Sequence, residues 1–258
     1  MWRLRFLGRV TVIRKLVKFI IGCYYYHGRV VVIQRGPLRG MSWFCNREHQ
    51  FWMPLGVYEK ETTQWLENQI QTDTIFFDIG ANAGYFSLLG SRIAKCGKVI
   101  SFEPVPTNIE TIKSHISENK INNIIIEPIV ISDKACLVEF SIEKTNANSH
   151  ISDVKIEHAV SNPLNTINVQ SVTLDEFSLE KKITPNVVKM DVEGAEVKVL
   201  MGAANLLKSG NAVWIISTHS TSLYEDCKNI MQSYGYRIDS LHGFHHELLC
   251  YPGNHNAQ

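Results

Sequence analysis

The central part of the chain alternates between short apolar runs and longer stretches whose apolar residues recur at helical spacing. IFFDI at 75–79 is a continuous apolar run of the buried-strand type, and GYFSLLGSRIAK at 84–95 has the spacing of a helix. KVISFEP at 98–104 predicts a second strand, residues 107–120 a polar-faced helix, and NIIIEPIVIS at 123–132 a third strand. This β-α-β-α-β order predicts a doubly wound α/β fold, with a parallel sheet and helices on both faces.

The second half of the chain continues this series after one exposed strand and a long polar loop. ACLVEFSIEK at 135–144 alternates like an exposed antiparallel strand, and residues 144–166 predict a polar loop of the kind that often covers a binding site. The elements expected after this loop are a buried strand at 186–192, a helix at 194–210 closed by Gly210, a strand at 212–218, a helix at 221–234, and strands at 235–241 and 246–252.

The residues before position 73 predict an extension with its own turn signals. Pro and Gly interrupt it in RGPLRG at 35–40 and in MPLGVYE at 53–59, and a lead-in helix follows at 59–70. We therefore expect two parts, an N-terminal extension with its lead-in helix at 1–72 and the main domain at 73–258.

The composition is that of a globular protein, but its charge is unevenly distributed. The 258 residues are 45% apolar and 20% charged, with a formal net charge of +1. Nine basic and no acidic residues precede residue 41, and the remaining 17 basic and 25 acidic residues give the rest of the chain a formal charge of −8. The nine basic residues are Arg3, Arg5, Arg9, Arg14, Lys15, Lys18, Arg29, Arg35 and Arg39.

The apolar stretch at 10–26 does not predict a membrane span. Arg14, Lys15 and Lys18 interrupt it, so it lacks the roughly 20 apolar residues that cross a bilayer, and no small-residue cleavage site follows it. Two roles stay open for residues 1–40: a helix that packs on the domain, or a basic amphipathic segment that contacts an anionic membrane. We expect a cytoplasmic protein, with peripheral contact at the inner membrane surface as the alternative.

Six cysteines lie far apart along the chain, without a C-x-x-C pair. This spacing is typical neither of a zinc ribbon nor of a small disulfide scaffold. It predicts free thiols in a reducing compartment. The cysteines are Cys23, Cys45, Cys96, Cys136, Cys227 and Cys250.

The stretch FDIGANAG places an acid and several small residues where the first strand gives way to the first helix. Ligands of open α/β sheets bind beyond the carboxyl ends of the strands, where glycine lets backbone N–H groups approach them. The spacing is G-x-x-x-G rather than the G-x-G-x-x-G of a pyrophosphate loop. Asp78 would repel a phosphate but bind an ammonium group. The loop therefore favours a nucleoside that carries a positively charged amino acid.

Glu103 ends the second strand, 19 residues after Gly84. Folds of this kind use a carboxylate at that place to bind ribose hydroxyls, and an acid there also rejects a 2′-phosphate. The loop and Glu103 together predict a nucleoside cofactor. The alternative is an ordinary strand-to-helix turn with a solvated glutamate.

Five motifs in this order resemble the FkbM-type methyltransferase family: FFDIGANAGYFS, SFEPVPTN, ISDKACLVEF, VTLDEF and VVKMDVEGAEVKVLMGA. The resemblance extends from about Phe51 to Leu223. It implies a class I methyltransferase fold, which is Rossmann-like with a seven-stranded, mostly parallel sheet. It also implies S-adenosylmethionine as the cofactor and methylation of a hydroxyl group of a sugar, glycolipid or natural product.

The resemblance also implies where the cofactor binds. The glycine loop would surround its methionine part, Glu103 its ribose, Asn108 its adenosine side, and Ser132 with Asp133 its adenine. The full set of expected cofactor-binding residues is Asp78, Gly80, Ala81, Asn82, Gly84, Phe86, Glu103, Pro104, Asn108, Ser132 and Asp133.

The motif DVEGAE adds three acids after a buried strand. Asp191 ends the strand, while Glu193 and Glu196 are expected in the first turn of the next helix, where acids are favoured as caps. Asp191 would share the rim of the sheet with Asp78 and Glu103. Those three acids could instead hold a divalent metal, an alternative that we do not favour from the sequence.

Methylation of an alcohol requires a group that takes its proton. His219, just after the strand at 212–218, is the first candidate base, with Asp191 as its partner or replacement. Lys189 shares the strand face of Asp191 and would orient an acid or a substrate oxygen, or lie at the sheet edge. Relatives are expected to carry a glutamate at position 217, where this chain has Ser217. This difference bears on the acceptor and on the base.

His242, His245 and His246 do not have the spacing of a metal motif, and adjacent residues of a strand point to opposite faces. We do not expect a metal there.

Three functions from different classes therefore compete. The first is an S-adenosylmethionine-dependent O-methyltransferase with a small-molecule or glycan acceptor. The second is a nucleic-acid methyltransferase or binder that uses the basic N-terminus, although no aromatic-basic RNA-binding motif favours it. The third is a non-catalytic, membrane-associated binding protein on the same fold.

Overall fold

The computed structural model describes residues 28–45, 52–142, 150–151, 165–241 and 246–253. The chain divides into two compact units, Met1–Tyr58 and Glu59–Gln258. The described part of the smaller unit contains an antiparallel strand pair, β1 (Val30–Val32) and β2 (Ser42–Phe44), and the short helix α2 (Trp52–Leu55). Most of the basic segment discussed above lies outside the described residues. Within them, every helix is too short or too polar to cross a bilayer.

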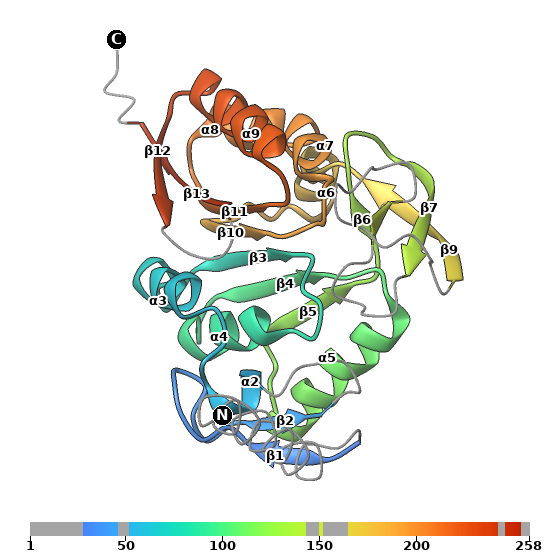
Figure 1. The fold of residues 1–258 in the computed structure, drawn as a ribbon, viewed down its shortest axis with the longest axis vertical. Coiled ribbons are helices and arrows are strands. Elements are labelled where there is room, and N and C mark those ends of the chain that lie inside the picture. Colours follow the sequence, from blue (N-terminus) through green and yellow to red (C-terminus); the bar gives the residue numbers. More distant parts are fainter. Residues whose placement is uncertain (1–27, 46–51, 143–149, 152–164, 242–245, 254–258) are drawn as a thin grey trace, which may run out of the picture. The chain divides into compact units, whose positions relative to one another are not determined.

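The larger unit is built around a seven-stranded sheet (Figure 1). Its strand order is β12-β13-β11-β10-β3-β4-β5, and the five strands from β11 to β5 run parallel. β13 is antiparallel to both of its neighbours. The mostly parallel sheet predicted from the sequence is therefore confirmed. The strand bounds are β3 (Ile75–Ile79), β4 (Lys98–Phe102), β5 (Ile124–Glu127), β10 (Val187–Met190), β11 (Val213–Thr218), β12 (Tyr236–Leu241) and β13 (His246–Pro252).

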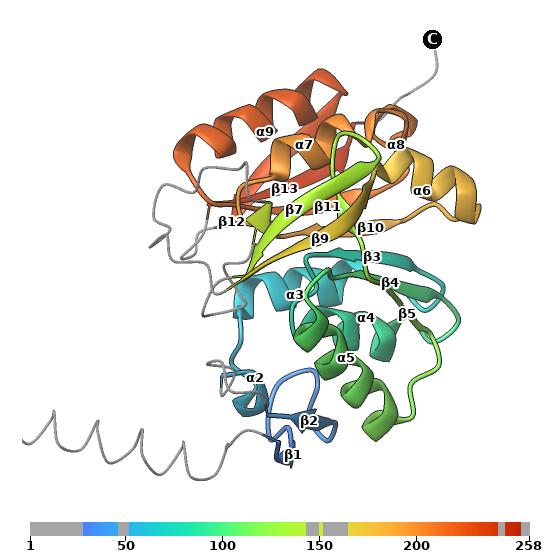
Figure 2. The same ribbon diagram turned by 90° about the vertical axis from the view of Figure 1, so that its right-hand side faces the viewer.

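Helices cover both faces of this sheet, as predicted. α3, α4 and α5 lie on one face and α6, α7, α8 and α9 on the other (Figures 1 and 2). The second face carries much of the core, in which the rings of Phe77, Phe102 and Phe177 meet edge to face at centroid distances of 4.9–5.9 Å. The helix bounds are α3 (Lys60–Gln69), α4 (Tyr85–Ile93), α5 (Pro106–Asn119), α6 (Leu174–Lys181), α7 (Glu196–Met201), α8 (Ala204–Ser209) and α9 (Thr221–Ser233).

The third strand predicted from the sequence is in fact two strands in different sheets. β5 ends at Glu127 in the central sheet, and β6 (Val130–Ile131) pairs with β9 in another. Pro128 lies between them, and a proline cannot donate the ladder hydrogen bond that a continuous strand would need. The prediction of one strand was therefore wrong.

The second sheet has four strands in the order β6-β9-β7-β8. β7 (Cys136–Ile142) is antiparallel to β9 (Asn165–Val172), which confirms the exposed antiparallel strand expected there. The predicted polar loop at 144–166 is shorter than expected at its C-terminal end, because β9 begins at Asn165, and β8 (His150–Ile151) interrupts it. Residues 143–149 and 152–164 lie outside the described residues.

The helix predicted at 194–210 is also two helices. α7 ends at Met201 and α8 starts at Ala204, and Gly202 lies between them. A Cβ atom on Gly202 would overlap the backbone oxygen of Ser132. The chain needs a glycine there because the helix break packs directly against the backbone just after β6.

We expect the substitution Gly202→Ala to destabilise the larger unit by about 1–3 kcal/mol, because the added methyl group forces the backbone near Ser132 to move. Thermal and urea unfolding of the full chain measures this change. Lys208→Ala, on the exposed side of α8, is the control and should change stability by less than about 0.5 kcal/mol. Equal stability of the two variants would contradict the packing argument.

Candidate active site

Four parallel strands bring the candidate residues to the rim of the sheet formed by the carboxyl ends of these strands. Asp78 lies at the end of β3, and the register pairs it with Ser101 on β4 and with Lys189 on β10. Asp191 follows β10 and His219 follows β11, which is the next strand in the sheet. Residues far apart in the sequence therefore meet because their strands are neighbours, at the rim where ligands of such sheets bind.

The glycine loop is shaped by contacts within the protein. Gly80 has φ 78° and Gly84 has φ 82°, both in the left-handed region that favours glycine. A Cβ atom on Gly80 would overlap the backbone oxygen of Asp191. The loop N–H groups of Gly80 and Ala81 donate to the Phe102 carbonyl at 3.0 and 3.1 Å, so these two groups have partners within the protein.

Glu103 holds the same loop from the neighbouring strand. Its buried carboxylate accepts hydrogen bonds from the backbone N–H of Asn82 at 2.7 Å and of Val105 at 2.9 Å. Burial raises the pKa of Glu103 to about 7, although both backbone bonds and a hydrogen bond from Asn108 act to lower it. The solvated glutamate of the alternative interpretation is therefore excluded. Glu103 is also poised to change its charge near neutral pH.

Asp78 is fully buried and only partly satisfied. Its Oδ2 accepts a hydrogen bond from the Ser87 hydroxyl at 2.6 Å, and Ser87 lies 2.7 Å from the Ser101 hydroxyl. In the part of the chain that the structure describes, nothing hydrogen-bonds the other oxygen, Oδ1. Burial raises the pKa of Asp78, opposed by the charge of Lys189. An unsatisfied buried carboxylate oxygen is costly, so it fits a ligand that donates a hydrogen bond.

The other expected cofactor residues also follow strands, although Ser132 and Asp133 follow β6 of the second sheet. Phe86 is in the first turn of α4, where Lys189 Nζ lies 4.9 Å from the centre of its ring. Pro104 follows Glu103, and the buried Asn108 lies in the first turn of α5. Ser132 donates a hydrogen bond to Asp133 at 3.0 Å, just after β6. All of them belong to loops or first turns after strands.

Lys189 is a buried cation in the middle of the sheet. Its ammonium group lies 3.3 Å from Asp191 Oδ2, and its side chain is 3% exposed. Since β10 lies between β3 and β11, the suggestion that Lys189 lies at a sheet edge was wrong. Burial lowers the pKa of Lys189, but Asp191 and Asp78 outweigh it and raise the pKa above its ordinary value. Lys189 therefore stays charged between the two acids.

The two glutamates of DVEGAE do not both cap a helix. α7 begins at Glu196, so Glu193 lies before the helix rather than in its first turn. Glu193 has φ 50° and Gly194 has φ 98°, which turns the chain so that the Glu193 carboxylate faces His219. The fully buried Glu196 accepts hydrogen bonds from the Gly194 N–H at 3.0 Å and from His219 Nδ1 at 2.7 Å. The capping interpretation of Glu193 was wrong, whereas Glu196 does lie in the first turn of α7 and contacts the histidine as well.

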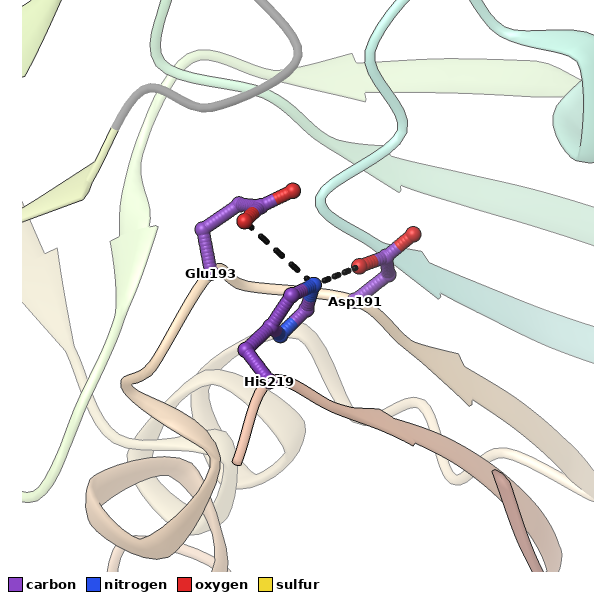
Figure 3. Close-up of side chains that lie close together, drawn as sticks. All are labelled: Asp191, Glu193 and His219. Carbon is purple, nitrogen blue, oxygen red and sulfur yellow. Dashed lines mark ion pairs between the residues drawn. The ribbon is translucent and has the colours of Figure 1, made fainter. Parts of the chain in front are cut away.

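His219 lies among three carboxylates. Figure 3 shows its ring between Asp191 and Glu193, whose oxygens lie 3.4 and 3.3 Å from Nε2. Burial lowers the pKa of His219, but hydrogen bonds to Asp191, Glu193 and Glu196 raise it to about 12. A protonated imidazole has no free lone pair, so this environment argues against the general-base role predicted for His219.

The neighbouring carboxylates differ in their affinity for protons. Burial acts to raise the pKa of Asp191, but Lys189 and His219 hold it below its usual range. Burial raises the pKa of Glu193, which the His219 ring opposes only in part. Of the two, Glu193 is therefore the better acceptor for a proton.

Glu247 is a residue that sequence reasoning missed. The antiparallel register of β11 and β13 places it directly opposite Ser217, so both side chains lie on the same face. Its buried carboxylate accepts a hydrogen bond from the Thr62 hydroxyl of α3 at 2.6 Å. The carboxylate expected at position 217 is thus present on the adjacent strand. Only the strand register reveals it.

The metal alternative drawn from the sequence grouped the wrong residues. Asp78 and Glu103 are tied to Ser87 and to the glycine loop, and the donor atoms that meet belong to Asp191, Glu193 and His219. Of the histidines at 242–246, His242 and His245 lie outside the described residues, and the side chain of His246 is not described.

Comparison with known proteins gives consistent results. The family described as "Methyltransferase FkbM domain" matches residues 78–238, which is more than half of the chain. The hexuronic acid methyltransferase AglP of Haloferax volcanii is 28% identical over 163 residues, covering 63% of each chain, so this chain spans less than two thirds of that relative's length.

A solved structure shares the fold. The methyltransferase FkbM structure from Methylobacillus flagellatus KT superposes with a TM-score of 0.53 at 18% identity, over 70% of this chain and 44% of that one. At this identity the match shows the fold alone.

We expect His219 to remain protonated in metal-free protein up to at least pH 9, because three carboxylates stabilise the imidazolium. Nitrogen-15 NMR of labelled histidine measures its charge state, and the His219→Gln variant identifies its signals. Glu196→Gln should lower the pKa of the ring, whereas the exposed control Glu180→Gln should not. A ring that titrates near pH 6.5 would show that the carboxylates do not act as the geometry indicates.

Proposed function

The chain belongs to the FkbM family of S-adenosylmethionine-dependent methyltransferases, and on this premise we propose that its acceptor is a hydroxyl group of a sugar. One observation carries the proposal. The glycine loop, with Asp78 and Glu103, lies beside the acidic cluster around His219, in a chain similar to a hexuronic acid methyltransferase. An alcohol needs both a methyl donor and a group that takes its proton.

The cofactor side of the proposal rests on Asp78 and Glu103. The Asp78 oxygen that lacks a partner among the described residues fits the ammonium group of the methionine part. Glu103, at the end of β4, would accept hydrogen bonds from the ribose hydroxyls. We assign the cofactor site to these residues and to Gly80, Ala81, Asn82, Gly84, Phe86, Pro104, Asn108, Ser132 and Asp133.

The acceptor side of the proposal rests on the cluster around His219. When bound, the cofactor supplies a methyl group on a positively charged sulfur, which keeps the bonding electron pair as the new carbon–oxygen bond forms. The protein must hold the acceptor oxygen in line and receive its proton. We assign proton acceptance to Glu193, whose side chain is 20% exposed at the rim.

The residues predicted as catalytic take supporting roles in this scheme. Lys189 fixes Asp191 through its ion pair, and Asp191 in turn holds His219. The His219 imidazolium directs the Glu193 carboxylate and offsets the charge of the surrounding acids. His219 thus positions the proton acceptor rather than serving as one.

The direct test combines cofactor binding with methyl transfer. We expect the full chain to bind S-adenosylmethionine and S-adenosylhomocysteine in calorimetry. In mass spectrometry we expect a glycoside to gain about 14 mass units, the mass of one CH₂ group. The acceptor panel should contain hexuronic acid and neutral hexose glycosides. Asp78→Asn should weaken cofactor binding about 10- to 100-fold by removing a charged acceptor. The surface substitution Asp73→Asn is the matched control and should leave binding unchanged.

Two results would contradict the proposal. Folded protein that binds neither form of the cofactor would remove the cofactor assignment. Protein that binds the cofactor but methylates no glycoside, while methylating an acceptor of another class, would remove the sugar assignment.

The pKa of Glu103 also predicts how cofactor binding depends on pH. With a pKa of about 7 in the free protein, Glu103 is mostly protonated at pH 6 and mostly ionised at pH 8. Ribose hydroxyls donate to the ionised form, so affinity for S-adenosylhomocysteine should rise about tenfold from pH 6 to pH 8. Calorimetry across this range measures the effect, and Glu103→Gln should flatten it. Affinity that falls with rising pH in the unsubstituted protein would contradict this assignment.

A further inference from the structure

The cluster around His219 has the form of a cation site as well as that of a proton-accepting site. Asp191, Glu193 and His219 each offer one donor atom, and these atoms lie within 4.8 Å of one another. Figure 3 shows the two carboxylates, both from the turn after β10, converging on Nε2 of His219, which follows β11. Their side chains are 15–25% exposed, so the cluster is open on one side.

A second observation concerns the far side of the histidine ring. Nδ1 lies 2.7 Å from Glu196 Oε1, and the Glu196 side chain is completely buried. Histidines that bind metals almost always donate their second ring N–H to a carboxylate or carbonyl, which fixes the ring so that the other nitrogen faces the ion. The Gly194 N–H holds the same Glu196 oxygen at 3.0 Å. The ring is therefore fixed by a group outside the three donors.

The distribution of contacts leaves one suitable atom on each acid. Asp191 directs Oδ2 to the Lys189 ammonium group and Oδ1 to His219, so only Oδ1 belongs to the cluster. Glu193 directs Oε2 to the ring. With Glu196 behind the ring, three carboxylates surround one imidazole. A divalent cation between the donors would offset this negative charge.

We propose that Asp191, Glu193 and His219 bind a divalent first-row metal ion of the Mn²⁺ type, which takes the place of the proton on Nε2 of His219. Carboxylates alone suit Mg²⁺ and Ca²⁺, whereas an imidazole nitrogen favours a transition metal, so two oxygen donors and one nitrogen donor point to Mn²⁺. Three protein donors leave coordination positions open for water or for an acceptor hydroxyl.

This inference rests on the proposed function and gives it a binding mode for the acceptor. The ion would bind the acceptor hydroxyl and make it more acidic, as bound metals do for water. The hydroxyl proton would pass to the second oxygen of Glu193. The acceptor oxygen would then supply the electron pair for the new bond to carbon, while the cofactor sulfur keeps the electron pair of the bond that breaks.

The first test measures Mn²⁺ binding without any methyl transfer. The full chain is treated with EDTA, dialysed and titrated with Mn²⁺, and the signal of free Mn²⁺ is followed by electron paramagnetic resonance. We expect one saturable site per chain, with Mg²⁺ competing at least about tenfold more weakly. The absence of saturable binding to the unsubstituted protein would overturn the proposal.

Three Glu→Gln variants locate the site. Glu193→Gln removes a donor and should weaken Mn²⁺ binding at least about tenfold, and Glu196→Gln should weaken it about 10- to 100-fold by releasing the ring. Glu180→Gln changes an exposed glutamate on α6 and should bind as the unsubstituted protein does. Thermal unfolding checks that all variants are folded. Equal affinity of Glu193→Gln and Glu180→Gln would place the ion elsewhere and overturn the proposal.

Methyl transfer in EDTA separates this inference from the proposed function. Transfer that continues in EDTA, together with no Mn²⁺ binding, overturns the metal site and leaves the sugar methyltransferase intact. Mn²⁺ binding that is lost in Glu193→Gln, together with no glycoside methylation, supports the metal site although the proposed acceptor fails.

Discussion

A lysine ammonium group buried in the middle of a parallel sheet must be balanced by carboxylates. This requirement fixes which side chains meet at the carboxyl ends of the strands. Lys189 lies beside Asp78 in the sheet register and 3.3 Å from Asp191. An unpaired buried charge would cost several kcal/mol, so the two acids and the lysine depend on one another. Their mutual contacts hold the ends of β3 and β10 at the distance that the Gly80–Asp191 approach requires.

The acids along this edge are chemically similar but have different surroundings, and the surroundings separate their roles. Asp78 is buried beside hydroxyls and a lysine, Glu103 accepts two backbone N–H groups, and Glu193 faces a histidine at the rim. Asp78 and Glu103 therefore belong to the glycine loop side, which we assign to the cofactor. Glu193 belongs with Asp191 and His219 on the side assigned to the acceptor. Lys189 joins the two sides, because it lies between Asp78 and Asp191.

The sheet register places a carboxylate opposite the position where a glutamate was expected. Ser217 stands where the family resemblance predicts a glutamate, and Glu247 on the neighbouring strand faces it. A carboxylate is thus present at the end of β11 although the expected position lacks one. Its hydrogen bond with Thr62 ties it to α3, so it is oriented by a helix that precedes the glycine loop in the chain.

The sequence by itself determined the elements whose signals are local. Apolar runs located the strands, the G-x-x-x-G loop and Glu103 indicated a nucleoside site, and Gly210 marked a helix end. The break at Pro128 is marked locally by the proline itself, but the change of sheet there and the contact of Gly202 with Ser132 are not local. The tertiary structure alone decided which acids meet. Glu193 and Glu196 surround His219 because β10 and β11 are neighbours, and strand order and register depend on the packing of the whole sheet.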